Sequence, residues 1–220
     1  MPPSPTVLAF DTSAAHCAAA LLCDGKLVQR TDDMARGQAE HLMPMLDCML
    51  ANEGLAWKDL DAIGVGIGPG NFTGIRISVS AARGLALGLR KPAVGVSNLE
   101  AQVFGISGVT VSCLDARRER AYVQVFGESD SPSTPALYDL TAETLPSLSA
   151  KTGAKVVGDH ANRIAEFAGW NAVQPTVTTI EAIARLSAQK LSGKPGRPAP
   201  LYIRSADAAP PKDRPPTVIP

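Results

Sequence analysis

Residues 64–89, GVGIGPGNFTGIRISVSAARGLALGL, constrain the fold more than any other part of this sequence. An apolar run at residues 62–66 is typical of a buried central strand, and a long helix is predicted to follow it. The glycine-rich elbow at residues 66–70 joins the two, with Asn71 or Thr73 as the predicted N-cap. A strand that enters a helix through glycines leaves backbone N–H groups free to face an anion. The elbow is therefore either an anion-binding loop or a tight turn without a ligand.

The predicted helix at residues 72–89 consists mostly of small and aliphatic side chains. The small ones are Ser78, Ser80, Ala81, Ala82, Gly84, Ala86 and Gly88, and the aliphatic ones are Ile75, Ile77, Val79, Leu85, Leu87 and Leu89. Small residues allow other backbones to approach closely. We therefore expect this helix to pack on more than one side.

The elbow matches neither of the common phosphate-binding motifs, because it contains no Gly-x-Gly-x-x-Gly and no Gly-Lys-[Ser/Thr]. The string Gly-Pro-Gly-Asn-Phe-Thr-Gly-Ile-Arg is more specific. It closely resembles GPGSFTGIRIG, the signature of the TsaB (YeaZ) family, with Asn71 in place of Ser and Ser78 in place of Gly. Residues 200–204, Pro-Leu-Tyr-Ile-Arg, resemble the family's Pro-x-Tyr-Leu-Arg segment. The resemblance therefore extends from the first strand to the tail.

Composition limits the classes of partner. The 220 residues carry 21 basic and 21 acidic side chains, whereas a chain that binds tRNA unaided is expected to be basic. No apolar run reaches the roughly 18 residues of a membrane span, and the start does not read as a secretion signal. The four cysteines are scattered, which argues against a disulfide framework or a zinc site. These features predict a soluble cytoplasmic protein.

The order of predicted elements indicates an α/β fold. Strands are expected at residues 6–10, 17–23, 26–31, 62–66 and 93–96, and helices at 38–53, 72–89 and 97–104. Three antiparallel strands continued by parallel ones make up the ribonuclease-H-like arrangement. This arrangement is the half-unit of the actin, sugar-kinase and Hsp70 superfamily, to which the TsaB family belongs.

A faint internal repeat predicts that this unit is duplicated. Residues 8–13, LAFDTS, and residues 111–117, VSCLDAR, are both apolar strands that end in Asp and lead into a second strand. Further strands are expected at 119–126 and 155–158, and helices at 142–150, 162–168 and 179–191. We therefore expect an N-terminal domain at 1–104, a reduced second domain at 105–192 and a proline-rich tail at 193–220.

The carboxyl end of the first strand is the candidate nucleotide site. Superfamily ATPases place a carboxylate there, so the resemblance implies weak ATP or ADP binding, at a subunit interface, by Asp11, Thr12, Ser13, Gly68, Gly70 and Asn71. The alternative is a turn whose side chains bond only to the local backbone. The equivalent second turn, residues 115–120, has no glycine and three arginines, so a two-loop phosphate clamp is not expected. No stable cofactor is predicted.

No metal site and no catalytic residue is predicted. The catalytic relatives of the family, of the TsaD type, carry a His-x-x-x-His pair that holds a metal. This chain has only His16, His41 and His160, which do not have that spacing. No pattern places a serine, a histidine and an aspartate together for nucleophilic catalysis either.

The two long helices, residues 38–53 and 72–89, are the predicted interface between subunits. Adaptable methionines facing small residues suit helix-on-helix docking. In the family these helices meet their counterparts on TsaD, and without TsaD the same surface pairs with itself. The resemblance and the helical pattern nominate Leu42, Met45, Met49, Thr73, Arg76, Ile77, Ser80, Ala81 and Gly84. The alternative is that these residues face the sheet of their own chain.

The resemblance implies a non-catalytic subunit that activates the synthesis of threonylcarbamoyladenosine at adenosine 37 of tRNA. Its expected partners are TsaD as a heterodimer, TsaE and TsaC as functional partners, and tRNA indirectly. The alternative is a stand-alone nucleotide-binding hydrolase or kinase, or a glycoprotease-like enzyme, of the same superfamily. A third hypothesis, a structural dimer without a tRNA connection, leaves the signature unexplained.

Overall fold

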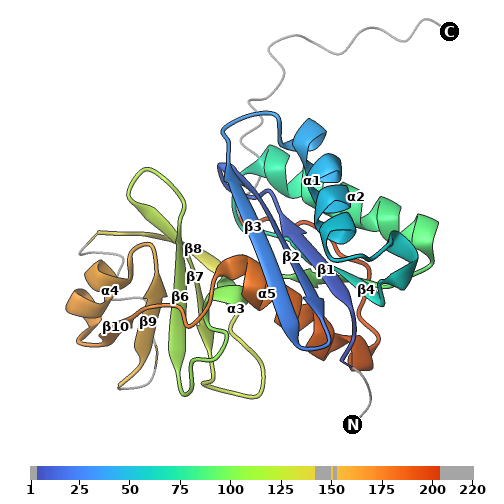
Figure 1. Ribbon diagram of the computed structural model, residues 1–220. Coiled ribbons are helices and arrows are strands. Elements are labelled where there is room, and N and C mark those ends of the chain that lie inside the picture. Colours follow the sequence, from blue (N-terminus) through green and yellow to red (C-terminus); the bar gives the residue numbers. More distant parts are fainter. Residues whose placement is uncertain (1–3, 142–149, 151–152, 204–220) are drawn as a thin grey trace, which may run out of the picture.

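The computed structural model describes residues 4–141, 150 and 153–203 and contains two five-stranded sheets (Figure 1). The first sheet has the order β3-β2-β1-β4-β5, in which the first three strands are antiparallel and β1, β4 and β5 are parallel. Its strands are β1 (Val7–Asp11), β2 (His16–Cys23), β3 (Lys26–Asp33), β4 (Ala62–Gly66) and β5 (Ala93–Val96). This order confirms the ribonuclease-H-like arrangement.

The second sheet repeats the first. Read from its other edge, its order is β8-β7-β6-β9-β10, which matches β3-β2-β1-β4-β5 strand by strand in position and direction. Its strands are β6 (Thr110–Asp115), β7 (Arg120–Phe126), β8 (Ala136–Asp139), β9 (Lys155–Gly158) and β10 (Asn171–Val173). The predicted duplication is therefore confirmed. The short strands β8 and β10 escaped prediction, and the helix expected at 142–150 lies almost wholly outside the described residues, as does the tail beyond 203.

Both faces of the first sheet are covered by helices. On one face lie α1 (Gln38–Asn52) and α2 (Phe72–Leu89), and on the other lies α5 (Thr179–Lys190), as Figure 1 shows. Side chains alternate along a strand, so Leu8 and Phe10 of β1 face α1 and α2, while Val7 and Ala9 face α5. Burial on both sides explains why β1 and β2 read as nearly continuous apolar runs.

The remaining helices of the described residues are short. They are η1 (Trp57–Asp59), α3 (Asn98–Gln102), α4 (Ala161–Ala168), which covers the second sheet, and η3 (Leu191–Gly193). The helix α3 joins the halves, because Ser112 of β6 donates to Gln102 at 2.8 Å.

The helix α5 connects the end of the chain back to its beginning. The predicted boundary at residue 104 assigned it to the second domain, yet it packs on β1, β2 and β4 of the first sheet. Its apolar side chains, such as Ile180 and Ile183, fill the face that α1 and α2 leave open. Residues 194–203 form a C-terminal strap that runs back along the first sheet, where Leu201 donates its N–H to the Ile67 carbonyl at 2.8 Å.

Candidate functional site

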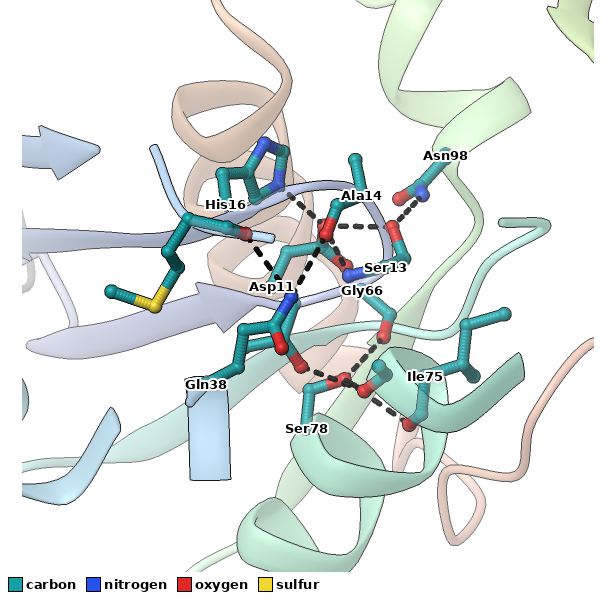
Figure 2. A network of polar contacts seen from close by, with 12 residues as sticks. Asp11, Ser13, Ala14, His16, Gln38, Gly66, Ile75, Ser78 and Asn98 are labelled. Atoms are coloured by element: carbon teal, nitrogen blue, oxygen red, sulfur yellow. Dashed lines mark hydrogen bonds and ion pairs between the residues drawn. The ribbon is translucent and has the colours of Figure 1, made fainter. Parts of the chain in front are cut away.

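Asp11, at the end of β1, is the centre of a buried polar network (Figure 2). The residue is 2% exposed. Its Oδ2 accepts the backbone N–H of Ser13 at 3.1 Å and the Ser13 hydroxyl at 2.7 Å, and it lies 3.1 Å from His16 Nε2. The hydrogen bond to Asp11 raises the pKa of His16, and the partial burial of the ring opposes that rise. Asn98 closes the network by donating to Ser13 Oγ at 2.7 Å.

These residues resemble a hydrolase triad in composition but not in order. A nucleophilic serine needs a base that takes its proton, and that base is usually a histidine held by a carboxylate. Here the carboxylate of Asp11 lies between the other two, so the Ser13 hydroxyl donates to Asp11 and not to His16. The arrangement orders the turn, and Ser13 lacks the hydrogen bond to a histidine that a Ser-His-Asp triad uses.

The glycine-rich elbow is closed over this turn. Asn71 donates its N–H to the Ser13 carbonyl at 2.6 Å, and the Thr12 hydroxyl donates to the Gly74 carbonyl at 2.7 Å. Asn71 is also the N-cap, since its side chain accepts the Gly74 N–H at 2.9 Å. Two backbone N–H groups that an anion would need are therefore already bonded within the chain, which favours the tight-turn interpretation of the elbow.

Close approach within the chain explains the glycines at this point. A Cβ on Gly74 would lie 1.8 Å from the Thr12 carbonyl oxygen, and one on Gly70 would lie 2.4 Å from the Ser13 carbonyl oxygen. A Cβ on Gly66 would lie 2.1 Å from Asp11 Oδ1. The spacing of glycines in the signature therefore records where α2 packs against the turn after β1.

The equivalent turn of the second half is open. Asp115, at the end of β6, accepts the Arg117 N–H at 3.0 Å and lies 3.1 Å from His160 Nε2. The bond to His160 is the main reason that the pKa of Asp115 is lowered. Residues 117–119 all have positive φ, between 54° and 61°, which is unusual for residues with side chains. Sequence reasoning missed His160, which follows β9 and is distant from Asp115 in the chain.

A cleft of about 580 Å³ lies between the two halves. Of the candidate nucleotide-binding residues, Ser13, Gly70 and Asn71 line it. Asp11 and Thr12 are buried beneath it, and neither they nor Gly68 belong to its lining. The second half contributes Leu114, Asp115, Ala116, Arg117, Tyr122 and Asp159. Asn98 also lines it, and only its place after β5 could have suggested that.

The residues predicted to form the interface differ in burial: those on α1 are buried, and those on α2 are exposed or half-buried. Leu42, Met45 and Met49 of α1 are 6% exposed or less and pack in the core against the first sheet, so as interface residues they are corrected to core residues. The helical period identified their shared face but not what covers it. On α2, the predicted residues that are exposed are Thr73, Arg76, Ser80 and Gly84, whereas Ile77 and Ala81 are half-buried.

The outer face of α2 contains glycines at which a side chain would meet nothing in the described part of the chain. A Cβ on Gly84 or Gly88 would meet no atom within 4 Å. Leu87, between them, is 74% exposed. At the N-terminal end of the helix, the guanidinium of Arg76 lies 3.6 Å from the centre of the Phe72 ring and donates to the Tyr202 hydroxyl at 2.9 Å. The C-terminal strap therefore adjoins this face.

The described residues contain neither a group of metal ligands nor a helix that could span a membrane. Among residues 4–141, 150 and 153–203, no three His, Cys, Asp or Glu side chains lie together as a metal site would require. No helix in this part of the chain has the length and apolar character of a membrane span.

Comparisons with known proteins identify the family. Residues 32–191 match the family model described as "TsaD: tRNA N6-adenosine threonylcarbamoyltransferase". The "tRNA threonylcarbamoyladenosine biosynthesis protein TsaB" of Haemophilus influenzae is 37% identical over 122 residues, which are 53% of this chain and 52% of the relative. The chain thus aligns with about half the length of this curated relative.

Two further relatives cover nearly all of the chain. An uncharacterized protein of Mycobacterium tuberculosis is 35% identical over 210 residues, which are 93% of this chain and 94% of the relative. A crystal structure from Pseudomonas aeruginosa, titled as an uncharacterized protein with similarity to peptidase YEAZ, superposes with a TM-score of 0.72 at 25% identity. That comparison covers 91% of this chain and 100% of the other. The chain belongs to the family described by the TsaD model, and within it to the TsaB (YeaZ) branch.

Proposed function

We propose that this chain is a non-catalytic subunit for the synthesis of N6-threonylcarbamoyladenosine at adenosine 37 of tRNA, and that it docks onto TsaD through the outer face of α2. The open positions of Gly84 and Gly88 carry this proposal. Glycine inside a helix is about 1 kcal/mol less favourable than alanine. No packing within the described chain offsets that cost, whereas a partner helix could approach closely at both positions.

The turn after β1 supports a role without catalysis. Asp11 and Ser13 bond to each other and to their neighbours, and the elbow covers them. Transfer of the threonylcarbamoyl group is assigned to TsaD, with TsaC supplying the adenylate and TsaE acting as the ATPase. Because the charge of this chain is balanced, tRNA is bound by the assembly and not by this subunit alone. We place the protein in the cytoplasm, where it self-associates through the same face when TsaD is absent.

Weak nucleotide binding belongs to the same proposal. The cleft between the halves presents Ser13, Gly70 and Asn71 to a ligand of the size of ATP or ADP. Among the residues that line the cleft, the single glycine is Gly70 of the first half, so we expect affinity to depend on the completed subunit interface. Calorimetric titration of ADP into this chain, with and without TsaD, tests that dependence.

The experiment is a reconstituted reaction with TsaC, TsaD, TsaE and unmodified tRNA from the same organism. Modified nucleoside is measured by mass spectrometry with the wild-type chain, with Gly84→Arg and without the chain. We expect product with the wild type and a loss of at least about tenfold with Gly84→Arg, because a long side chain then occupies the proposed contact.

Gly196→Arg is the matched control. Gly196 also has open space around its Cβ position but lies outside α2. Arginine favours helix far more than glycine does, so Gly84→Arg should not lower the stability of α2. The proposal would be refuted if the wild type, Gly84→Arg and Gly196→Arg all gave the same amount of product. It would also be refuted if the reaction without this chain gave as much product as the reaction with the wild type.

A further inference from the structure

Carboxylates outnumber cations among the charged groups that line the cleft between the two halves. Of the described lining residues, Asp115 and Asp159 carry a negative charge and Arg117 alone carries a positive one. The Asp115 N–H donates to Asp159 Oδ2 at 2.8 Å, so both carboxylates lie on the same wall. A phosphate chain would add further negative charge beside them, and like charges repel strongly where water is partly excluded. This wall therefore disfavours the phosphates of a nucleotide.

The first half offers phosphates no cationic side chain in the cleft. None of its described residues that line the cleft is a lysine or an arginine. At the start of α2, the Gly74 N–H donates to Asn71 Oδ1 at 2.9 Å, and the Asn71 N–H donates to the Ser13 carbonyl at 2.6 Å. The Asn71 side chain thus accepts a hydrogen bond that an anion at this helix end would otherwise accept.

Hydrogen-bond acceptors, in contrast, are in excess. Asn98 lines the cleft and is 7% exposed. Its amide nitrogen donates to Ser13 Oγ (Figure 2), whereas its buried Oδ1 has no donor among the described residues. A buried acceptor without a donor is unfavourable, and ionised carboxylates such as those of Asp115 and Asp159 only accept. The cleft therefore suits a ligand with several hydroxyl or amino donors.

Tyr122 adds an aromatic ring to the same cleft. Along β7, Tyr122 lies between Ala121 and Val123, whose side chains are buried in the core of the second half. The Tyr122 side chain therefore lies on the opposite face of the sheet. Aromatic rings stack on bases of every kind, and the cleft volume of about 580 Å³ is within the range of small-ligand sites. A nucleoside combines such a base with hydroxyl and amino donors.

We propose that the cleft binds the nucleoside part of a nucleotide and makes no stabilising contact with its phosphates. This inference rests on the weak nucleotide binding proposed above and specifies which part of the ligand this chain recognises. The phosphates are then left to a partner subunit or to solvent. The opposite arrangement would place the phosphates against two carboxylates, with only Arg117 among the described lining residues to compensate.

The test is a calorimetric titration of adenosine, AMP and ADP into the isolated full-length chain, in EDTA and again with Mg²⁺. We expect adenosine to bind at least as tightly as AMP and ADP under both conditions, because the added phosphates gain no contact. The inference is overturned if ADP binds more tightly than adenosine under either condition.

Two variants test whether the ligand lies in the cleft. Asp115→Asn removes one negative charge and keeps an acceptor, so ADP should gain about threefold in affinity relative to adenosine at low ionic strength. Tyr122→Ala should weaken adenosine binding about tenfold through the loss of stacking. An unchanged ratio of the two affinities in Asp115→Asn, or an unchanged adenosine affinity in Tyr122→Ala, would also overturn the inference.

Glu166→Gln is the matched control, since it removes a negative charge from the second half at an exposed position on α4 that does not line the cleft. It should change neither affinity, and thermal melts should show all variants folded.

The outcomes separate this inference from the proposals above. If ADP but not adenosine binds the isolated chain, the inference is overturned and weak nucleotide binding stands. The same holds if none of the three ligands binds the isolated chain, yet ADP binds its mixture with TsaD more tightly than TsaD alone. If the chain adds no nucleotide binding either alone or with TsaD, both proposals about nucleotides fail together. The docking role is decided separately by the reconstituted reaction.

Discussion

Asp11 and Asp115 end the first strands of two sheets with the same strand order, and each contacts a histidine. Asp11 is buried, holds the backbone and hydroxyl of Ser13, and lies beneath the elbow. The Asp115 side chain is 49% exposed and faces the cleft. One topological position therefore serves as a sealed structural turn in the first half and as an open turn in the second.

The glycines account for the difference. In the first half, Gly70 and Gly74 let the start of α2 close over the turn. In the second half, Gly158 at the end of β9 packs against the Cys113 carbonyl, and His160 from the following segment contacts Asp115. A sealed turn fixes α2 firmly against the sheet by its inner side. The outer side of α2 is then free to carry the interaction that we propose.

The largest effect on stability is expected from a substitution that pushes α2 away from the turn after β1. In Gly74→Ala, the new methyl group would lie 1.8 Å from the Thr12 carbonyl oxygen, so the backbone of the turn or of α2 must shift. We expect the free energy of unfolding to fall by about 3 kcal/mol. Urea denaturation followed by circular dichroism measures the change.

Gly84→Ala is the matched control on the same helix. Its methyl group meets no atom of the described residues within 4 Å, and alanine favours helix, so the free energy of unfolding should rise by about 0.8 kcal/mol. If both substitutions changed stability by the same amount, the distinction between contact glycines and open glycines would be wrong.

The second prediction compares the two carboxylates directly. Asp11→Ala leaves the buried N–H and hydroxyl of Ser13 without their acceptor, which should cost about 2–3 kcal/mol. Asp115→Ala removes an exposed carboxylate whose partners can bond to water, which should cost less than about 1 kcal/mol. Unfolding by urea at neutral pH measures both. A larger loss for Asp115→Ala would reverse the assignment of sealed and open turns.

Much of this framework follows from the sequence, because local patterns determine it. The helix predicted at 72–89 has those bounds in the structure, and the one predicted at 38–53 ends one residue earlier. The strands at 62–66, 93–96 and 155–158 are also as predicted. Long apolar runs and glycine boundaries specify such elements without reference to the rest of the chain.

The remainder depends on contacts between distant segments. The periodicity of α1 shows that Leu42, Met45 and Met49 share a face, but only the sheet beneath them shows that this face is core. His16 and Asp11 are close in sequence, whereas Asp115 and His160 are brought together by the pairing of β6 with β9. The glycine elbow suggested an anion site, because the sequence does not reveal that residues 12–13 fill the space above it.

The smallest effect is a difference in how pH acts on the two histidine–carboxylate pairs. Because Asp11 raises the pKa of His16 above 6.5 in the folded protein, this pair contributes stability that is fully present below pH 6.5. The contribution is lost as pH rises through the raised pKa. The pKa of Asp115 is lowered below 3.8, so its contribution is present above pH 3.8 and is lost as pH falls through the lowered pKa.

The free energy of unfolding, measured across both pH ranges, should therefore show two separate limbs, each below about 1 kcal/mol because solvent screens partly exposed pairs. His16→Gln should flatten the limb above pH 6.5 and leave the acid limb in place. Asp115→Asn should reduce the acid limb, to which the lowered pKa values of Asp32 and Glu119 also contribute, and should leave the limb above pH 6.5 in place. If either substitution flattened both limbs, the two turns would titrate as one unit. In that case the sealed turn and the open turn would be coupled across the cleft, and the independence of the two halves would have to be given up.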